Sequence, residues 1–248
     1  MSTLHVIRHA QASMFAANYD ELSTRGREQA RILGEVLGLR LRAAERPGYD
    51  VVVCGPAQRH LDTAALAGAG LRAAGRSFPA PEVVAGFDEH DGQALVMAAL
   101  AQLAQREGGL AAHAELARLA AEAANTALDP LQRSRSWQRL FEAVMASWLR
   151  AELELEGVET WASFEARVSA SFDELRARHR GEVALFTSVG PSAVILARVL
   201  ELPPAKAFAQ AWRLYNASIT RVVYSKARMT LDGFNEVAHL PLALWTHR

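Results

Sequence analysis

Short apolar segments of strand length alternate along the chain with longer segments that have helical periodicity. The strand-like segments are TLHVIR at 3–8, DVVVC at 50–54, EVVAGF at 82–87, EVALFT at 182–187 and SITRVVYS at 218–225. Between the strands, apolar residues recur at helical spacing, as they do in the second half of residues 18–42. Strands that alternate with helices predict an α/β domain with a mostly parallel sheet sandwiched by helices.

The boundaries of two predicted helices carry capping signals. Asp20 and Ser23 are candidate N-caps for the helix within residues 18–42. Pro56 suits the first position of a helix that runs to about Ala67, because proline already has a helical φ angle.

Residues 93–156 differ in composition from the rest of the chain, because they are rich in alanine and strongly helical. They predict three helices, with breaks at Gly108-Gly109 and at Asp129-Pro130. We therefore expect residues 1–248 to form a single α/β domain that carries a helical insertion at about 93–156.

The bulk properties exclude several classes of protein. Twenty-seven Lys and Arg residues balance 27 Asp and Glu residues, so no strong field is available to attract nucleic acid. No apolar run approaches the roughly 20 residues of a membrane helix, and the N-terminus lacks the pattern of a signal peptide. The single cysteine, Cys54, argues against a disulfide or a cysteine-based metal cluster. We expect a cytoplasmic protein that binds neither nucleic acid nor membranes.

Polar residues with phosphoryl chemistry follow three of the predicted strands. Arg8 and His9 end the first strand, Arg59 lies just after the second, and Glu89 follows the third. Ligands of open α/β sheets bind beyond the carboxyl ends of the strands. Arginine binds phosphate oxygens, a neutral imidazole can act as a nucleophile, and a protonated carboxyl can donate to a leaving oxygen. Each residue alone is a weak signal, but together they indicate a site for phosphoryl transfer.

Five motifs in order along the chain resemble those of one family. They are VIRHAQAS at 6–13, YDELSTRGREQA at 19–30, CGPAQRHLDTA at 54–64, FDEHDG at 87–92 and FNEVAHL at 234–240. The chain resembles the histidine phosphatase superfamily, in the branch that includes cofactor-dependent phosphoglycerate mutase. Ala10 stands where the family's first motif has glycine. The motifs lie on both sides of residues 93–156.

The resemblance implies a mechanism and a set of site residues. His9 would attack phosphorus and become phosphohistidine, and Glu89 would protonate the leaving oxygen. Arg8 and Arg59 would bind the phosphoryl oxygens, and Ser13, on the loop after His9, is a further candidate for a phosphate contact. Water would then hydrolyse the phosphoenzyme, so the route needs no metal and no cofactor. The implied substrate is a small phosphorylated molecule.

One expected residue is missing from this pattern. The family has a second histidine in an S-H-G-G turn after a strand, and Ser188 in TSVGPSAV occupies the matching position. A one-residue shift of the alignment would place Val189 there instead. No histidine lies between His179 and His239, so the loss does not depend on the alignment. A serine keeps a hydrogen bond but loses a positive charge, which could slow the reaction by on the order of 10²–10³.

Three interpretations remain open at this point. The chain could be an active phosphatase with a serine-modified pocket, or a phosphate- or phospholigand-binding protein with little or no turnover. A mutase is the third interpretation, but a mutase must protect its phosphohistidine from water, and the altered pocket gives no reason to expect that.

Several neighbouring residues allow more than one interpretation. His60 follows Arg59 where the family usually has alanine, and we expect its side chain to point away from the site. His90 and Asp91 flank Glu89 and could share its acid role, and Asp88 is another candidate, but the family segment favours Glu89. His239, in the terminal motif, is expected to be structural.

The insertion also has two interpretations. In this superfamily, segments inserted after the acid-bearing strand form a cap over the pocket, and residues 93–156 would be that cap. Their low arginine content disfavours a polyphosphate substrate and permits one with an apolar part. Alternatively, the apolar helical face could form the interface of a homodimer.

Overall fold

The computed structural model describes residues 1–12, 20–105, 108–153 and 155–247, and the chain divides into two compact units. The first unit combines Met1–Glu89 with Arg167–Arg248, and the second is His90–Ala166. No helix among the described residues has both the length and the apolar character that crossing a membrane would require.

A sheet of six described strands forms the centre of the first unit, in the order β3-β2-β4-β1-β5-β6. The strands are β1 (Ser2–Arg8), β2 (Val51–Cys54), β3 (Glu82–Val83), β4 (Glu182–Thr187), β5 (Ile219–Tyr224) and β6 (Met229–Glu236). The first four strands pair in parallel, whereas β5 and β6 are antiparallel additions on one side. This arrangement confirms the prediction of a mostly parallel sheet.

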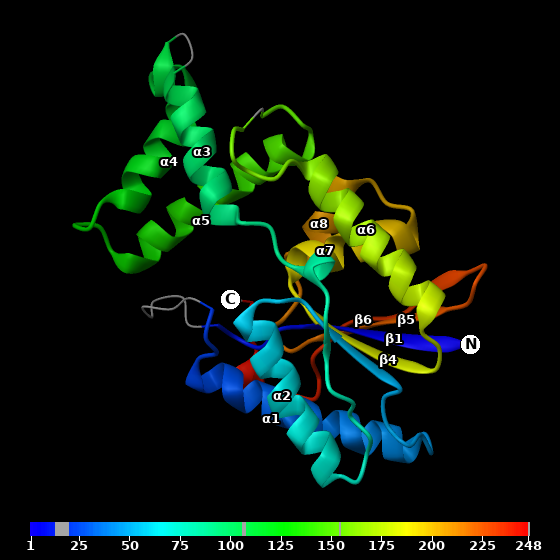
Figure 1. The fold of residues 1–248 in the computed structure, drawn as a ribbon. Coiled ribbons are helices and arrows are strands. Elements are labelled where there is room, and N and C mark those ends of the chain that lie inside the picture. The colour runs from blue at the N-terminus through cyan, green and yellow to red at the C-terminus, as the bar shows by residue number, and fades with distance from the viewer. Residues whose placement is uncertain (13–19, 106–107, 154, 248) are drawn as a thin grey trace. The chain divides into compact units, whose positions relative to one another are not determined.

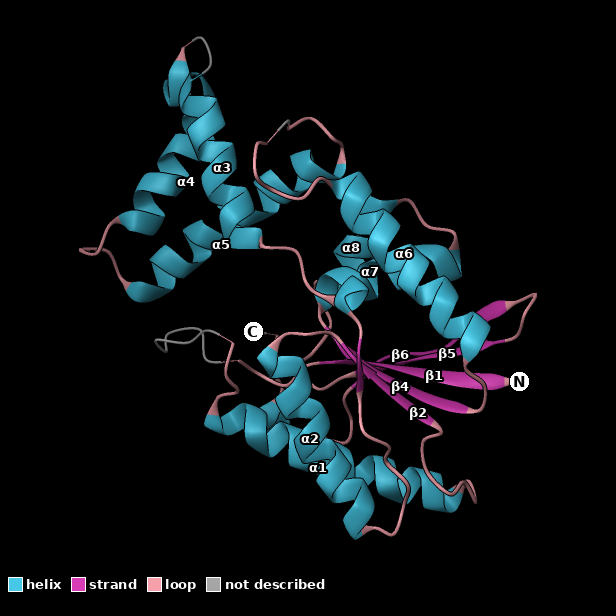
Figure 2. Ribbon diagram, in the orientation of Figure 1, coloured by secondary structure: helices cyan, strands magenta, loops and turns pink. Residues whose placement is uncertain are grey.

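Helices cover both faces of this sheet (Figures 1 and 2). On one face lie α1 (Thr24–Ala43) and α2 (Gln58–Ala73), and on the other lie α7 (Val189–Leu200) and α8 (Pro204–Ala211). The C-terminal part of α6 (Trp161–Arg178) packs beside α7, where Arg198 forms an ion pair with Asp173 at 2.9 Å. The buried apolar faces of α1 and α2 form one continuous core with β1, β2 and β4.

The capping predictions for this unit had different outcomes. Ser23 caps α1 by accepting a hydrogen bond from Gly26 N at 3.0 Å, as predicted. Asp20 instead accepts bonds from Gln58 N at 2.7 Å and Arg59 N at 3.4 Å, so it holds the start of α2. That helix begins at Gln58, two residues after Pro56.

The predicted strand at 82–87 was wrong beyond Val83. The chain turns into a short 3-10 helix at Ala85–Phe87, and Asp88 N donates to Ala85 O at 3.0 Å. The turn buries the Phe87 side chain completely. Gly86 lies so close to α6 that a Cβ atom would be 1.8 Å from Ser171 Oγ. Burial of Phe87 and this close approach favour a turn over a longer edge strand.

The second unit is helical and contains α3 (Gly92–Gln105), α4 (Ala114–Ala124) and α5 (Pro130–Leu149). Asp129 caps α5 by accepting bonds from the backbone of Leu131 and Gln132. A buried aromatic cluster packs inside this unit, with rings from His90, Phe141, Trp148, Trp161 and Phe164. The unit contains the range 93–156, and both the cap and the dimer interface stay predictions.

Candidate active site

Three parallel strands of the first unit end side by side, and each is followed by a residue of the candidate site. In the sheet, Arg8 at the end of β1 is opposite Thr187 at the end of β4. On the other side of β4, Phe186 is opposite Cys54 at the end of β2. His9 and Ser188 therefore leave neighbouring strands at the same edge, which is the edge where α/β sheets bind ligands.

His9 is buried, and its ring is fixed by a hydrogen bond to its own chain. The Nδ1 atom lies 2.8 Å from Ala10 O. Because a carbonyl oxygen can only accept, Nδ1 carries the proton and the lone pair of the neutral ring is on Nε2. Burial, together with the charges of Arg59 and Arg8, holds the pKa of His9 well below its usual value. The ring is thus kept neutral, in the form that can attack phosphorus.

Two residues that the sequence analysis left without a role hold the backbone around His9. Ala10 N donates to Thr63 Oγ1 at 3.0 Å, and Thr63 in turn donates to Arg59 O at 2.7 Å. Asn216 Nδ2 donates to His9 O at 3.2 Å. These bonds tie the loop after β1 to the first turns of α2 and to the segment before β5.

The two arginines are anchored differently. Arg8 is buried and donates through Nη1 to Leu214 O. Arg59 donates through Nη1 to Asp20 Oδ1 at 2.6 Å and through Nη2 to Ser188 Oγ at 3.3 Å. Asp20 therefore both holds the start of α2 and balances the charge of Arg59.

The prediction that His60 points away from the site was wrong. His60 is fully buried, and its Nε2 atom lies 2.6 Å from Ser188 Oγ. Its ring centroid is 5.7 Å from that of His9. The signal was present in the sequence, because His60 shares one helical face with Ala64, Ala67 and Leu71, all of which are buried.

Two adjacent carboxyls, those of Asp88 and Glu89, lie at the end of the segment Met1–Glu89 of the first unit. Glu89 accepts a hydrogen bond through Oε2 from Gly190 N at 3.0 Å, in the first turn of α7. This bond places Glu89 beside Ser188, the residue that precedes the same helix. Asp88 accepts a bond from Glu89 N at 2.9 Å, and burial raises the pKa of the Asp88 carboxyl. Both carboxyls therefore remain candidates for the proton donor.

His90 and Asp91, which also flank Glu89 in sequence, belong to the second unit. The His90 ring stacks on Trp148 with the centroids 5.2 Å apart. Asp91 accepts a bond from Ala94 N at 2.9 Å and so holds the start of α3. Both side chains thus have structural roles within the second unit.

Ser13 lies outside the described residues. Its predicted phosphate contact stays a prediction.

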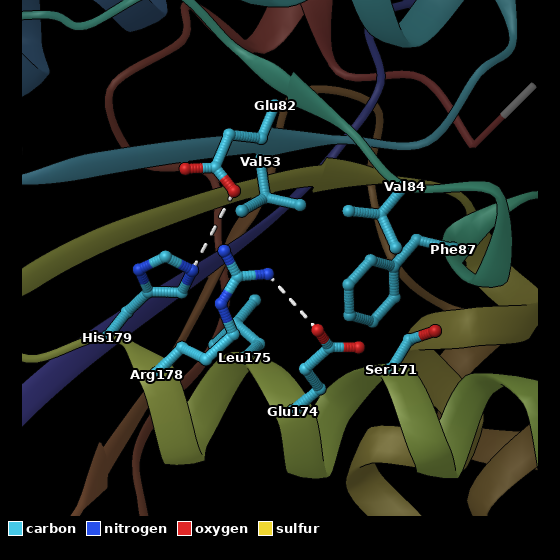
Figure 3. A pocket seen from close by; sticks show the side chains of 9 residues that line it. All are labelled: Val53, Glu82, Val84, Phe87, Ser171, Glu174, Leu175, Arg178 and His179. Carbon is cyan, nitrogen blue, oxygen red and sulfur yellow. Dashed lines mark hydrogen bonds and ion pairs between the residues drawn. The ribbon is translucent and has the colours of Figure 1, made fainter.

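The structure also has a shallow pocket elsewhere in the first unit, between β3 and the C-terminal half of α6 (Figure 3). Two pairs of polar side chains line it, His179 with Glu82 at 3.8 Å and Arg178 with Glu174 at 3.1 Å. None of the site residues named above lines this pocket. In the described part of the chain, no three or more His, Cys, Asp or Glu side chains are grouped as a metal site would need.

A comparison with protein families points to the same superfamily as the motifs. The model of the histidine phosphatase superfamily (branch 1) matches residues 122–237. This stretch includes Ser188 but not Arg8 or His9. A search of curated protein sequences found no match.

Solved structures match the fold over nearly the whole chain. A mycobacterial glucosyl-3-phosphoglycerate phosphatase is 22% identical, with a TM-score of 0.58 over 95% of this chain and 99% of its own. A phosphoserine phosphatase variant from Entamoeba histolytica is 14% identical, with a TM-score of 0.58 over 97% of this chain and 100% of its own. A structure called mycobacterial hydrolase 2 is 22% identical, with a TM-score of 0.60 over 98% of this chain and 94% of its own. These similarities establish the α/β fold.

Proposed function

We propose that this chain is a phosphomonoester phosphatase of the histidine phosphatase superfamily, a proposal supported by its five motifs and by the family model that matches residues 122–237. The reaction would run through a phosphohistidine on His9, and the substrate would be a small phosphorylated molecule. The phosphoserine and glucosyl-3-phosphoglycerate phosphatases among the structural neighbours act on compounds of this general kind.

The observation that carries the proposal is the state of His9. Its Nδ1 proton is held by Ala10 O at 2.8 Å, which leaves the lone pair on Nε2, and the pKa of the ring is lowered by burial and by the two arginines. A buried neutral imidazole that feels the charges of Arg8 and Arg59 is suited to attack an anion that those charges attract.

The proposed reaction has two steps. In the first, the His9 Nε2 lone pair forms a bond to phosphorus while the bond between phosphorus and the ester oxygen breaks, and Glu89 gives its proton to that oxygen. In the second, a water molecule attacks the phosphohistidine, and the Glu89 carboxylate takes a proton from the water. Inorganic phosphate leaves, and His9 returns to its neutral form. Arg8 and Arg59 stabilise the negative charge in both steps.

The test compares the wild-type protein with His9→Ala on p-nitrophenyl phosphate and on a panel of phosphomonoesters that includes phosphoserine. We expect the wild type to turn over at least one substrate and His9→Ala to lose nearly all of that activity. A rapid quench should trap a phosphoenzyme that survives base and is lost in acid, as expected for phosphohistidine. Equal activity in the two proteins would contradict the proposal.

A second candidate function is binding of a phosphorylated ligand with little turnover. The observation that favours it is the 2.6 Å bond from Arg59 Nη1 to Asp20, which occupies part of the guanidinium, together with the neutral Ser188 in place of a histidine. Calorimetry with inorganic phosphate separates the two functions. If the wild type binds inorganic phosphate tightly but turns over no substrate of the panel, the result would favour a phosphate-binding protein over a phosphatase.

A further inference from the structure

We infer that His60 and Ser188 act as one unit of the phosphoryl pocket, in which the His60 ring positions the Ser188 hydroxyl to donate to a phosphoryl oxygen. The inference rests on the proposed function of the same site. His60 would be a positioning residue, because it acts through Ser188.

The direction of the Ser188 side chain is the first observation. Ser188 is the N-cap residue of α7, where a serine hydroxyl ordinarily accepts a bond from the first turn of its helix. Here the side chain makes no capping bond, and Gly190 N in that turn donates to Glu89 instead. The hydroxyl lies 2.6 Å from His60 Nε2 and 3.3 Å from Arg59 Nη2. It is therefore held by α2 and not by the helix that it precedes.

The burial of His60 is the second observation. A fully buried imidazole needs a hydrogen-bond partner, and the Ser188 hydroxyl provides one. The backbone makes room for the ring at Gly55, where a Cβ atom would lie 2.5 Å from His60 Nδ1. Burial and the charge of Arg59 lower the pKa of His60 to about 3. The ring is therefore neutral at ordinary pH and contributes a hydrogen bond to the pocket, not a charge.

The tautomer of His60 decides the role of the hydroxyl. A serine hydroxyl has one hydrogen to donate and two lone pairs that accept. When Arg59 Nη2 and a protonated His60 Nε2 both donate to Ser188 Oγ, its own hydrogen is left to point at an anion. The other tautomer of His60 would take that hydrogen and turn lone pairs toward the anion, which is repulsive. Binding of a phosphoryl group therefore selects the tautomer in which His60 donates.

This arrangement bears on the histidine that the resemblance expects at position 188. The family usually has alanine at position 60, whereas this chain has histidine at 60 and serine at 188. An imidazole is thus still present near the phosphoryl pocket, but it comes from α2 and reaches the substrate through a hydroxyl. The two departures from the family pattern are explained as one exchange.

The test is a double-mutant cycle with a reciprocal exchange. The variants are His60→Ala, His60→Gln, Ser188→Ala, the double variant His60→Ala/Ser188→Ala, Ser188→His, and the exchange His60→Ala/Ser188→His. Two readouts are followed, kcat/KM on p-nitrophenyl phosphate and the affinity for vanadate by calorimetry, which does not require turnover. Thermal unfolding of every variant is measured alongside.

We expect Ser188→Ala and His60→Ala each to lower kcat/KM by on the order of 10², as for loss of one transition-state donor, and the double variant to be no worse than either. His60→Gln should keep much of the activity, because its amide can donate to the hydroxyl. Ser188→His alone should be impaired, because the new ring would meet His60. The exchange variant should recover activity relative to Ser188→His.

A second pair of a histidine and a hydroxyl offers a matched control. His5 Nδ1 lies 2.6 Å from Tyr49 Oη, and His5 precedes Arg8 by three residues of β1, which is about 10 Å along the strand. Tyr49→Phe should change the unfolding temperature and leave kcat/KM and vanadate affinity as they are.

Two results with the variants would overturn the inference. In one, the effects of His60→Ala and Ser188→Ala multiply. In the other, His60→Ala lowers only the unfolding temperature, as Tyr49→Phe does. A wild type that binds no vanadate also overturns it. A wild type that binds vanadate but is no more active than His9→Ala contradicts only the proposed function, and the affinities then decide whether His60 and Ser188 act together.

Discussion

At the level of single residues, substrates with different leaving groups can distinguish whether Asp88 or Glu89 is the proton donor. Glu89→Gln should reduce kcat/KM, which reports the step that releases the leaving group, strongly for alkyl phosphates, whose leaving oxygen needs a proton. The effect should be much smaller for p-nitrophenyl phosphate, whose leaving group departs as an anion. Asp88→Asn should lack this dependence on the leaving group. Rate constants for both variants on the two substrate classes provide the measurement.

If Asp88→Asn shows the dependence on the leaving group and Glu89→Gln does not, Asp88 is the proton donor. Burial raises the pKa of the Asp88 carboxyl, which favours its protonated form, so this outcome has its own physical basis. Equal losses on both substrate classes in both variants would indicate that neither carboxyl transfers the proton.

Residue positions at the strand ends were easier to predict than the bonds between them. The ends of β1 and β4 determine the positions of Arg8, His9 and Ser188, because parallel strands bring their carboxyl ends together. The pairing of His60 with Ser188 spans 128 residues, and it depends on how α2 is rotated against the sheet. A pattern of apolar positions gives the buried face of a helix, but not which polar atom that face meets.

At the level of elements, the close contact of α1 and α2 depends on glycine. A Cβ atom on Gly34 would lie 2.2 Å from Ala67 O, and one on Gly70 would lie 2.8 Å from Glu35 N. We expect Gly34→Ala to force the helices apart and to lower the free energy of unfolding by roughly 1–3 kcal/mol. Because α2 also carries Arg59 and His60, vanadate affinity should fall as well. Chemical denaturation and calorimetry measure the two effects.

Gly38→Ala serves as a milder control for Gly34→Ala. A Cβ atom there would lie 2.7 Å from the Ala74 methyl group, at the end of α2 and away from Arg59. A smaller loss of stability and no change in vanadate affinity are expected. If the two variants weaken binding equally, the helix contact does not position the site.

The elements themselves were predicted with differing success, for local reasons. Ser23 caps the helix that it precedes, as predicted, because a cap needs only neighbouring backbone. Asp20 holds the start of α2 instead of capping α1. This contact joins distant parts of the chain, so a local sequence pattern does not predict it. The strand expected at 82–87 is short because burial of Phe87 and contact with α6 decide its course.

At the level of the whole molecule, the alternation of strands and helices was enough to predict the α/β class and the mostly parallel sheet. Pairing of β5 and β6 in the antiparallel direction was not predictable from their composition, because β-branched residues suit both kinds of sheet. The change in composition near residue 93 located a helical segment, but the compact unit extends to His90–Ala166 because His90 and Trp161 join its aromatic cluster.

Stability of the whole chain should fall in mild acid, because several histidines are held neutral in the folded state. Burial lowers the pKa of His5 and His239 to about 4 and that of His60 to about 3, and the pKa of His9 is also well below its usual value. In the unfolded chain these rings titrate near pH 6.5. Between about pH 6.5 and 4 the unfolded state therefore binds more protons, so the free energy of unfolding falls as pH falls.

Each such histidine contributes up to about 1.4 kcal/mol per pH unit within that window. The raised pKa values of Asp88 and Glu182 act in the opposite direction, so we expect a net uptake of roughly two to four protons on unfolding near pH 5. Chemical denaturation from pH 8 to pH 5 measures this slope. His5→Gln and His60→Gln should each reduce it by about one proton. A slope that is flat below pH 6.5, or unchanged in both variants, would mean that these rings are already protonated in the folded protein.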